Sequence, residues 1–256
     1  MDALVLAGGK ASPDFQTAAG VENRALAELA PGKTMLDFVM GALLEAKSID
    51  RIFVIGAVPE SVNYVLVAPG ESLMDNLILG ARAMGQNAKK QALLVSADIP
   101  FITGEAVDDF ASKGGQLGAG FCYPIIPMDD YNAQFAGMKR TTLRLREGEF
   151  TGGNVILADP TFLIQNEATV RSAYAARKSV LKLGSMLGWG LLLRVILSQT
   201  ISSKLLSISN LESGVSRLLG KGATARALIT SFASLGTDVD KLEDVEVARK
   251  MLANRS

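Results

Sequence analysis

The sequence has 256 residues, 48% of them hydrophobic and 20% charged, and its 26 lysines and arginines balance its 26 aspartates and glutamates. This is the composition of a globular protein, and a formal net charge of zero provides no basic field for nucleic acid. The chain has no histidine and one cysteine, Cys122. These counts exclude an internal disulfide, a Ser-His-Asp triad, a Cys-His pair and zinc sites made of histidine or clustered cysteine. A metal would therefore bind oxygen ligands, as Mg²⁺ and Mn²⁺ do.

The first hundred residues alternate between apolar runs and helical patterns. Helices are predicted from Thr34 and from about Leu73, where apolar residues recur on one helical face. The predicted buried strands are residues 3–7, 51–57, 64–68 and 92–97. Strands that alternate with helices predict a mostly parallel sheet with helices on both faces, a three-layer α/β/α fold.

The second half of the chain is less regular. Its predicted strands are residues 117–126, 141–147, 154–158 and 224–232, and a closing helix is predicted at 241–253. Residues 167–220 have the pattern of a helical insertion, so residues 1–256 are predicted to form one domain that contains this insertion.

The most apolar stretch of the chain is 186–197. It is too short to span a bilayer and Arg194 interrupts it, so it predicts a buried or interfacial helix. A membrane contact through 180–197 and a dimer surface are the alternatives. The N-terminus lacks the pattern of a signal peptide, and a cytoplasmic protein is expected.

Two adjacent glycines and a lysine follow the first predicted strand, in the stretch ALVLAGGK. The spacing is neither that of a P-loop nor that of a dinucleotide fingerprint, and about two dozen residues precede the first predicted helix. This connection carries Gly8, Gly9, Lys10, Arg24 and Lys33. Adjacent glycines let backbone N–H groups face an anion, and three cations can neutralise a polyphosphate. A plain tight turn with solvated cations is the alternative reading.

Carboxylates occur at two places where a metal could bind. Asp98 directly follows the strand predicted at 92–97, on the sheet edge that also carries the glycines, and suits a cation that bridges to phosphate. An ordinary turn aspartate before Pro100 is the alternative. Asp238 and Asp240 begin a second cluster, in which Asp240 can form a capping box with Glu243. Asp238 could face a metal while Asp240 caps the helix, or the reverse.

Further polar residues could contact a ligand. Gly152 and Gly153 precede a strand, where a close approach of the backbone to a ligand and a β-bulge are both plausible, and Asn154 could bind a sugar hydroxyl. Ser72 is a candidate helix N-cap, while Ser72 and Asn76 could also bind the edge of a nucleobase.

Six motifs occur in the order typical of nucleotidyltransferases with the GT-A-like, Rossmann-like fold: LVLAGGK, NRALAEL, PGKTMLDFVMGAL, VSADIPFIT, TGGN and DVDKLEDVEVARKML. Over residues 1–160 and 222–253 the chain most resembles the branch that contains molybdenum cofactor guanylyltransferase. The family commonly has an arginine beyond the glycines and then a lysine before x-Leu. Here no arginine follows the glycines closely, and Arg24 stands at the position of that lysine.

The resemblance implies the Mg²⁺-dependent transfer of a nucleoside monophosphate from an NTP, with GTP among the candidate donors, to a small phosphorylated acceptor, with loss of pyrophosphate. An anionic phosphate acceptor needs no general base, which agrees with the absence of histidine. A catalytically weak nucleotide-binding or regulatory protein, and a glycosyltransferase that uses an NDP-sugar, are the alternatives. An oligomer is also compatible with the sequence.

We assign the candidate site residues on this basis. The catalytic candidates are Lys10, Arg24 and Asp98. The candidate metal ligands are Asp98, Asp238 and Asp240, and the candidate acceptor-binding residues are Gly152, Gly153 and Asn154. The candidate nucleotide-binding residues are Leu6, Ala7, Gly8, Gly9, Lys10, Lys33, Ser72, Asn76 and Ala97.

Overall fold

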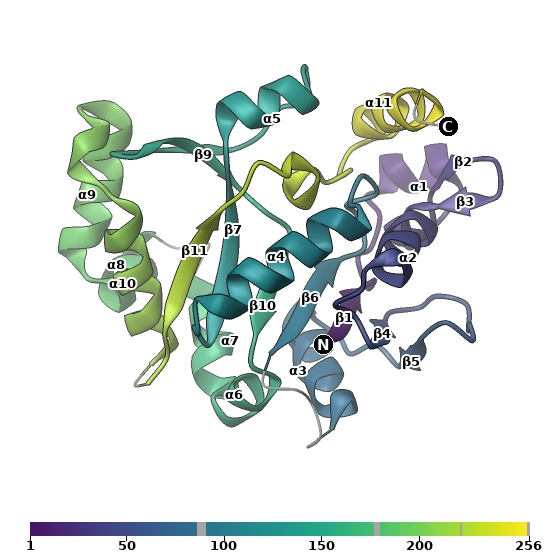
Figure 1. The fold of residues 1–256 in the computed structure, drawn as a ribbon, viewed down its shortest axis with the longest axis horizontal. Helices are drawn as coiled ribbons and strands as arrows, with labels where there is room; N and C mark the ends of the chain where they lie inside the picture. The colour runs from purple at the N-terminus through teal and green to yellow at the C-terminus, as the bar shows by residue number, and fades with distance from the viewer. Residues whose placement is uncertain (86–90, 177–179, 221, 255–256) are drawn as a thin grey trace.

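The computed structural model of the chain describes residues 1–85, 91–176, 180–220 and 222–254. Within them, nine strands form one sheet in the order β5-β4-β1-β6-β10-β7-β9-β8, with β11 paired to β7 (Figure 1). The strands of this sheet are β1 (Asp2–Leu6), β4 (Arg51–Ile55), β5 (Val65–Val67), β6 (Ala92–Ser96), β7 (Phe121–Pro127), β8 (Thr142–Leu145), β9 (Gly148–Gly152), β10 (Val155–Ala158) and β11 (Ala225–Ile229). A separate hairpin pairs β2 (Glu28–Ala30) with β3 (Lys33–Thr34).

The sheet is mostly parallel, as the sequence predicts. β4, β1 and β6 pair in parallel, β5 pairs in parallel with β4, and β11 pairs in parallel with β7. β9 and β10 run against their neighbours and form two sections of one bent strand, which is interrupted at Gly153 and Asn154. Because β11 comes from the end of the chain, the two ends of the sequence share one sheet.

Helices cover both faces of this sheet. The α-helices are α1 (Pro13–Ala19), α2 (Met35–Glu45), α3 (Leu73–Met84), α4 (Gly104–Gln116), α5 (Met128–Gln134), α6 (Pro160–Gln165), α7 (Glu167–Ala176), α8 (Val180–Leu187), α9 (Trp189–Thr200), α10 (Ile208–Leu219) and α11 (Leu242–Ala253). α2 and α4 pack on one face, and α3, α6 and α7 pack on the other. This arrangement confirms the three-layer α/β/α prediction.

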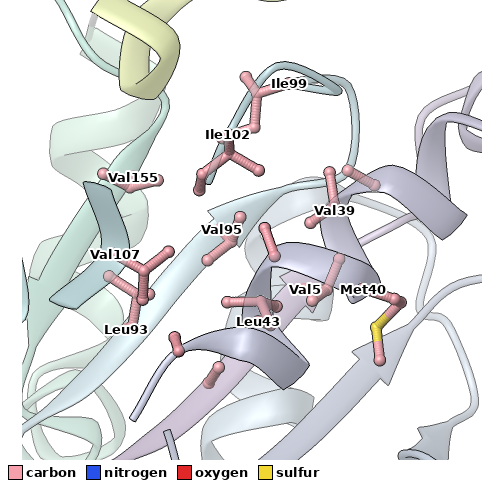
Figure 2. Close-up of a cluster of buried hydrophobic side chains, with 14 of the residues drawn as sticks. Val5, Val39, Met40, Leu43, Leu93, Val95, Ile99, Ile102, Val107 and Val155 are labelled. Atoms are coloured by element: carbon pink, nitrogen blue, oxygen red, sulfur yellow. The ribbon is translucent and has the colours of Figure 1, made fainter. Parts of the chain in front are cut away.

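The strands are buried because alternate side chains enter different cores. In β1, Val5 joins the core under α2 and α4, while Leu4 joins the core under α3. Figure 2 shows the first of these cores, in which Val39 and Leu43 of α2 lie over Val5 and Val95 of the sheet. Two-sided burial explains why these strands are continuous apolar runs in the sequence.

Most of the helical segment between β10 and β11 lies at the β8 and β9 side of the sheet (Figure 1). Leu191 of α9 packs with Leu145 of β8 and Phe150 of β9. Residues 160–219 are mostly helical, as predicted, apart from 177–179, which lie outside the described residues. Their treatment as an insertion within a single domain stays a prediction.

The apolar stretch 186–197 does not form one buried helix. Gly188, with φ of 91°, separates α8 from α9, and Trp189, Leu193 and Ile196 are exposed while Leu191 is buried. A fully buried helix, one form of the prediction, is therefore wrong for α9, and the other form, an interfacial helix, stays a prediction. None of the helices in the described residues has the length and apolar character needed to cross a membrane.

The sequence suggests a long irregular loop after the glycines. This prediction is wrong, because the connection contains α1. Ser12 caps this helix, Pro13 opens it, and Gly20 with φ of 68° ends it. The predicted capping box of Asp240 with Glu243 is also wrong. α11 begins one residue later, and the carboxylate of Asp244 accepts hydrogen bonds from the backbone of Asp240 and Lys241.

Candidate active site

A cleft of about 1180 Å³ opens where β1 and β6 end. The carboxyl ends of parallel strands meet at one edge of the sheet, which is where α/β proteins bind their ligands. The cleft is lined by the residues that follow β1, by those that follow β6, and by Asp238 and Asp240 near the C-terminus. Segments from both ends of the chain thus build one site.

The glycine pair forms the cleft wall next to α3. A Cβ at Gly8 would lie 2.4 Å from Nδ2 of Asn76, whereas a Cβ at Gly9 would meet nothing closer than 3.5 Å, at Arg24. Asn76 is buried, and its Oδ1 accepts a hydrogen bond of 2.7 Å from the backbone of Gly70. A side chain at position 8 would therefore have to displace the amide of Asn76, and neither glycine adopts a positive φ.

Asn23 holds the ends of the glycine connection together, a role that the sequence did not reveal. Its Nδ2 donates to the carbonyl oxygens of Ala7 at 2.7 Å and Ala57 at 3.0 Å, and its Oδ1 caps a short 3₁₀ turn at Arg24–Leu26. The backbone N–H of Arg24 donates to Gly9. The available signal was an asparagine, a strong N-cap residue, directly before Arg24.

Arg24 bridges two carboxylates across the cleft. Its NH2 group lies 2.6 Å from Oδ2 of Asp98, and its NH1 group lies 2.6 Å from Oδ1 of Asp240. The other oxygen of Asp98 accepts a hydrogen bond from the hydroxyl of Ser96. The carboxylates of Asp98 and Asp240 therefore share the guanidinium of Arg24.

A second arginine, which the sequence did not single out, neutralises Asp238. Arg140 forms an ion pair with Asp238 and donates to the carbonyl oxygen of Gly152 at 3.2 Å. Burial raises the pKa of the nearby Tyr123, and the charge of Arg140 opposes this with a smaller effect, so the phenol is neutral at ordinary pH. No pattern around Arg140 marks it, because its partner lies 98 residues away in the sequence.

The segment 152–154 is shaped by packing. A Cβ at Gly152 would lie 2.3 Å from the hydroxyl oxygen of Tyr123, and one at Gly153 would lie 2.5 Å from Pro124. Asn154 lines the cleft, and its Nδ2 is buried without a hydrogen-bond partner. The amide of Asn154 is thus a donor that a ligand in the cleft could satisfy.

Comparisons with known proteins identify the family of the chain. The family model described as "MobA-like NTP transferase domain" matches residues 3–176. The chain belongs to this family. It is therefore a nucleotidyltransferase. No curated protein matches the sequence.

Solved structures share the fold of this NTP transferase. A hypothetical transferase from Thermus thermophilus superposes with a TM-score of 0.82 and 33% identity, over 95% of this chain and 98% of the other. CMP:2-keto-3-deoxy-manno-octonic acid synthetase complexed with CTP superposes with a TM-score of 0.62 and 12% identity, over 100% of this chain and 99% of the other. The 2-C-methyl-D-erythritol 4-phosphate cytidylyltransferase of Thermus thermophilus superposes with a TM-score of 0.55 and 11% identity, over 99% of this chain and 100% of the other. The last two are similar in fold alone.

Most of the predicted site residues of this NTP transferase meet in the cleft. The predicted residues that line the cleft are Leu6, Ala7, Gly8, Gly9, Lys10, Arg24, Ser72, Asn76, Ala97, Asp98, Gly153, Asn154, Asp238 and Asp240. Ser72 also caps α3, as the sequence predicts. Gly152 does not line the cleft. Lys33 lies in the β2–β3 hairpin and lines a separate hollow with Glu28 and Arg249, so its predicted place beside the glycines is wrong.

The carboxylates of this NTP transferase provide the right donors for a hard divalent cation. The described residues contain no group of three or more histidine, cysteine, aspartate or glutamate side chains that could hold a metal alone. Mg²⁺ is usually bound by one or two carboxylates together with water and substrate phosphates. Asp98 and Asp240, which already share the cation Arg24, fit that partial set.

Proposed function

We propose that the protein transfers a nucleoside monophosphate from an NTP to a phosphate oxygen of a small phosphorylated acceptor, with Mg²⁺ or Mn²⁺ as cofactor. In this reaction the acceptor oxygen forms a bond to the α-phosphorus. The bond between that phosphorus and the oxygen that bridges it to the β-phosphate breaks, and pyrophosphate leaves with this oxygen. The observation that carries the proposal is the placement of Arg24 between Asp98 and Asp240, beside Gly8, Gly9 and Lys10.

Each polar group of the cleft has a part in this proposal. The backbone around Gly8 and Gly9 binds the triphosphate, and Lys10 supplies positive charge. Lys10 is exposed, and the described residues give it no ion-pair partner, so its ammonium is available to a ligand. Asp98 and Asp240 would hold the divalent cation, with Asp238 as a further candidate. A bound cation supplies neutralisation of the charge that develops on the phosphates.

No base is needed in this proposal. A phosphate acceptor is already anionic near neutral pH, so the protein has only to align the two substrates and stabilise charge. Ser72 and Asn76 are the candidates for contact with the nucleoside, and Asn154 is the candidate for contact with the acceptor. The neighbour that is complexed with CTP and the resemblance to a guanylyltransferase make CTP and GTP the first donors to test. A cytoplasmic location, predicted from the sequence, completes the proposal.

The test is the release of pyrophosphate from each of the four NTPs, with and without Mg²⁺, in the presence of a panel of phosphorylated acceptors. Asp98→Asn should lower the rate at least 100-fold, because the neutral amide gives up the charge of a metal ligand. Asp129→Asn, on the exposed start of α5, is the matched control and should retain the full rate. Full activity of Asp98→Asn would refute the metal assignment. Release of an NDP in place of pyrophosphate would identify an NDP-sugar transferase.

A further inference from the structure

One half of the cleft is apolar. Its floor is the sheet face that also carries α3, with Leu94 of β6, Ile156 of β10, and Phe121 and Tyr123 of β7. Phe121 and Tyr123 point to this face because Cys122, between them, points into the opposite core. Asp98 follows β6 and Asn154 precedes β10, and both strands also contribute to the apolar floor. The polar and apolar halves are therefore parts of one cleft.

Three helices of the segment between β10 and β11 wall this half. The residues that they contribute to the cleft are Leu163 of α6, Val170, Ala173 and Tyr174 of α7, and Val215, Leu218 and Leu219 of α10. All seven are apolar or aromatic. The charged residues of the lining within the described part of the chain come from elsewhere, chiefly from the turns at the carboxyl edge of the sheet.

Ion pairs join one of the three wall helices, α7, to α3. Arg171 of α7 lies 2.7 Å from Asp75 of α3 and 2.9 Å from Glu167, and Glu167 lies 2.8 Å from Arg82 of α3. These contacts tie α7 to the helix that forms the nucleotide side of the cleft. The α7 side of the apolar half is therefore fixed to α3.

The cleft is larger than a pocket for one drug-sized molecule. A pocket for one drug-sized molecule has about 300–1,000 Å³, and this cleft has about 1180 Å³. The triphosphate needs the cations and N–H groups of the polar half. Phosphates or sugar hydroxyls placed against the three helices would lose hydrogen bonds to water and find few partners there, at a free-energy cost.

We propose that the apolar half binds an apolar group, such as a hydrocarbon chain or an isoprenoid-like tail, carried by the phosphorylated acceptor. This proposal rests on the proposed function and specifies its acceptor class. The acceptor phosphate lies near Asn154 and the glycine connection, and its apolar part extends along Phe121 and Ile156 between α7 and α10. Burial of that part supplies affinity and selects against small polar phosphates.

Calorimetric titration of the full chain with n-alkyl phosphates, from butyl to octyl, tests the proposal. Each buried methylene contributes ~0.8 kcal/mol, so affinity should increase about fourfold per methylene, with a negative heat-capacity change. Inorganic phosphate should bind weakly. Affinity that does not change with chain length would overturn the proposal.

Two variants locate the binding. Ala173→Phe places a ring in the apolar half and should abolish the increase with chain length, while Ala175→Phe, on the exposed face of α7, should preserve it. Equal affinities in the two variants would place the alkyl chain elsewhere, for example on the exposed face of α9, and refute the proposal. If Ala173→Phe does not fold, Val215→Thr, which keeps the side-chain shape, should lower octyl phosphate affinity severalfold.

The outcomes separate this proposal from the proposed function. NTP-dependent release of pyrophosphate without any dependence on chain length would refute the apolar acceptor and retain the transferase. Loss of NTP binding in Ala173→Phe, with alkyl phosphate binding intact, would assign the apolar half to the nucleoside and overturn the proposal. Alkyl phosphate binding by a protein that turns over no NTP would refute the proposed function alone.

Discussion

Arg24 makes both of its cleft contacts with carboxylates that a divalent cation would also bind. Its side chain is 23% exposed, Asp98 is 13% exposed and Asp240 is 52% exposed, so the two pairs are only partly protected from water. Such pairs contribute modestly to stability. In the free protein the guanidinium pairs with two carboxylates and offsets one of their two negative charges, and a divalent cation that binds the same two oxygens must displace it from them.

Removal of Arg24 should therefore strengthen metal binding. In Arg24→Gln the metal no longer competes with a guanidinium, and a partly exposed ion pair of ~0.5–1 kcal/mol corresponds to Mn²⁺ binding about two- to fivefold more tightly. Titration of the nucleotide-free protein with Mn²⁺, followed by the EPR signal of the free ion, measures this change. Arg51→Gln, which removes an arginine paired with Asp2 away from the cleft, should leave Mn²⁺ affinity unchanged. Weaker Mn²⁺ binding in Arg24→Gln would contradict the competition.

The position of each cleft residue was easier to predict than its partner. Gly8 and Asp98 end apolar strands, and the end of a parallel strand can be read from the local sequence. The contact of Arg24 with Asp98 joins residues 74 apart, and that of Arg140 with Asp238 joins residues 98 apart. No local pattern encodes such pairs, so the pairing of Arg24 and Arg140 with the candidate metal ligands emerged only with the fold.

At the scale of elements, α7 and α3 are joined by charge. Hydrogen bonds from Ser72 and then from Arg171 lower the pKa of Asp75 below its usual value of 3.8. A lowered pKa in the folded state adds stability that is complete above the unfolded-state pKa and is lost as pH falls through the folded one. The connection between the two helices should therefore weaken below about pH 4.

Arg171→Gln should reduce this dependence on pH. Without the guanidinium, the pKa of Asp75 moves back toward its usual value, and the decrease in free energy of unfolding between pH 6 and pH 3 becomes smaller than in the unmodified protein. Urea unfolding at both pH values measures the difference. Lys113→Gln, which breaks an ion pair with Asp109 inside the single helix α4, is the control and should retain the full decrease. An equal decrease in Arg171→Gln and the unmodified protein would refute the role of Arg171.

Elements that were missed share weak or conflicting signals. α4 has two adjacent glycines near its end, and its buried stripe contains only two residues larger than alanine, Val107 and Phe110. Glycine disfavours helix formation, so the local sequence of α4 gives only a weak helical signal. α1 is only seven residues long, but Ser12, Pro13 and Gly20 are the residues expected at its two ends, so it could have been predicted. Strands β1, β4 and β6 were clear because burial on both faces makes them apolar throughout.

At the scale of the whole molecule, the cleft joins the two ends of the chain. Residues 6–10 and 24 come from the first strand and its connection, while Asp238 and Asp240 follow β11, which pairs with β7. A ligand that bridges these segments links parts of the sheet that are far apart in sequence. Occupation of the cleft should therefore stabilise the whole fold against unfolding, and not only the loops that touch the ligand.

The preferred NTP should raise the melting temperature only when a divalent cation is present. At a ligand concentration of 100 times Kd, binding to the folded state adds ~2.7 kcal/mol, which corresponds to about 5–10 °C for a chain of this size. Thermal unfolding with each of the four NTPs, with and without Mg²⁺, measures this shift. Asp98→Asn should lose the part of the melting-temperature shift that depends on Mg²⁺, because the amide keeps the shape of the side chain but not its charge. Equal stabilisation with and without Mg²⁺ would show that the triphosphate is held by Lys10, Arg24 and backbone N–H groups alone, and the carboxylates would then serve only to place Arg24.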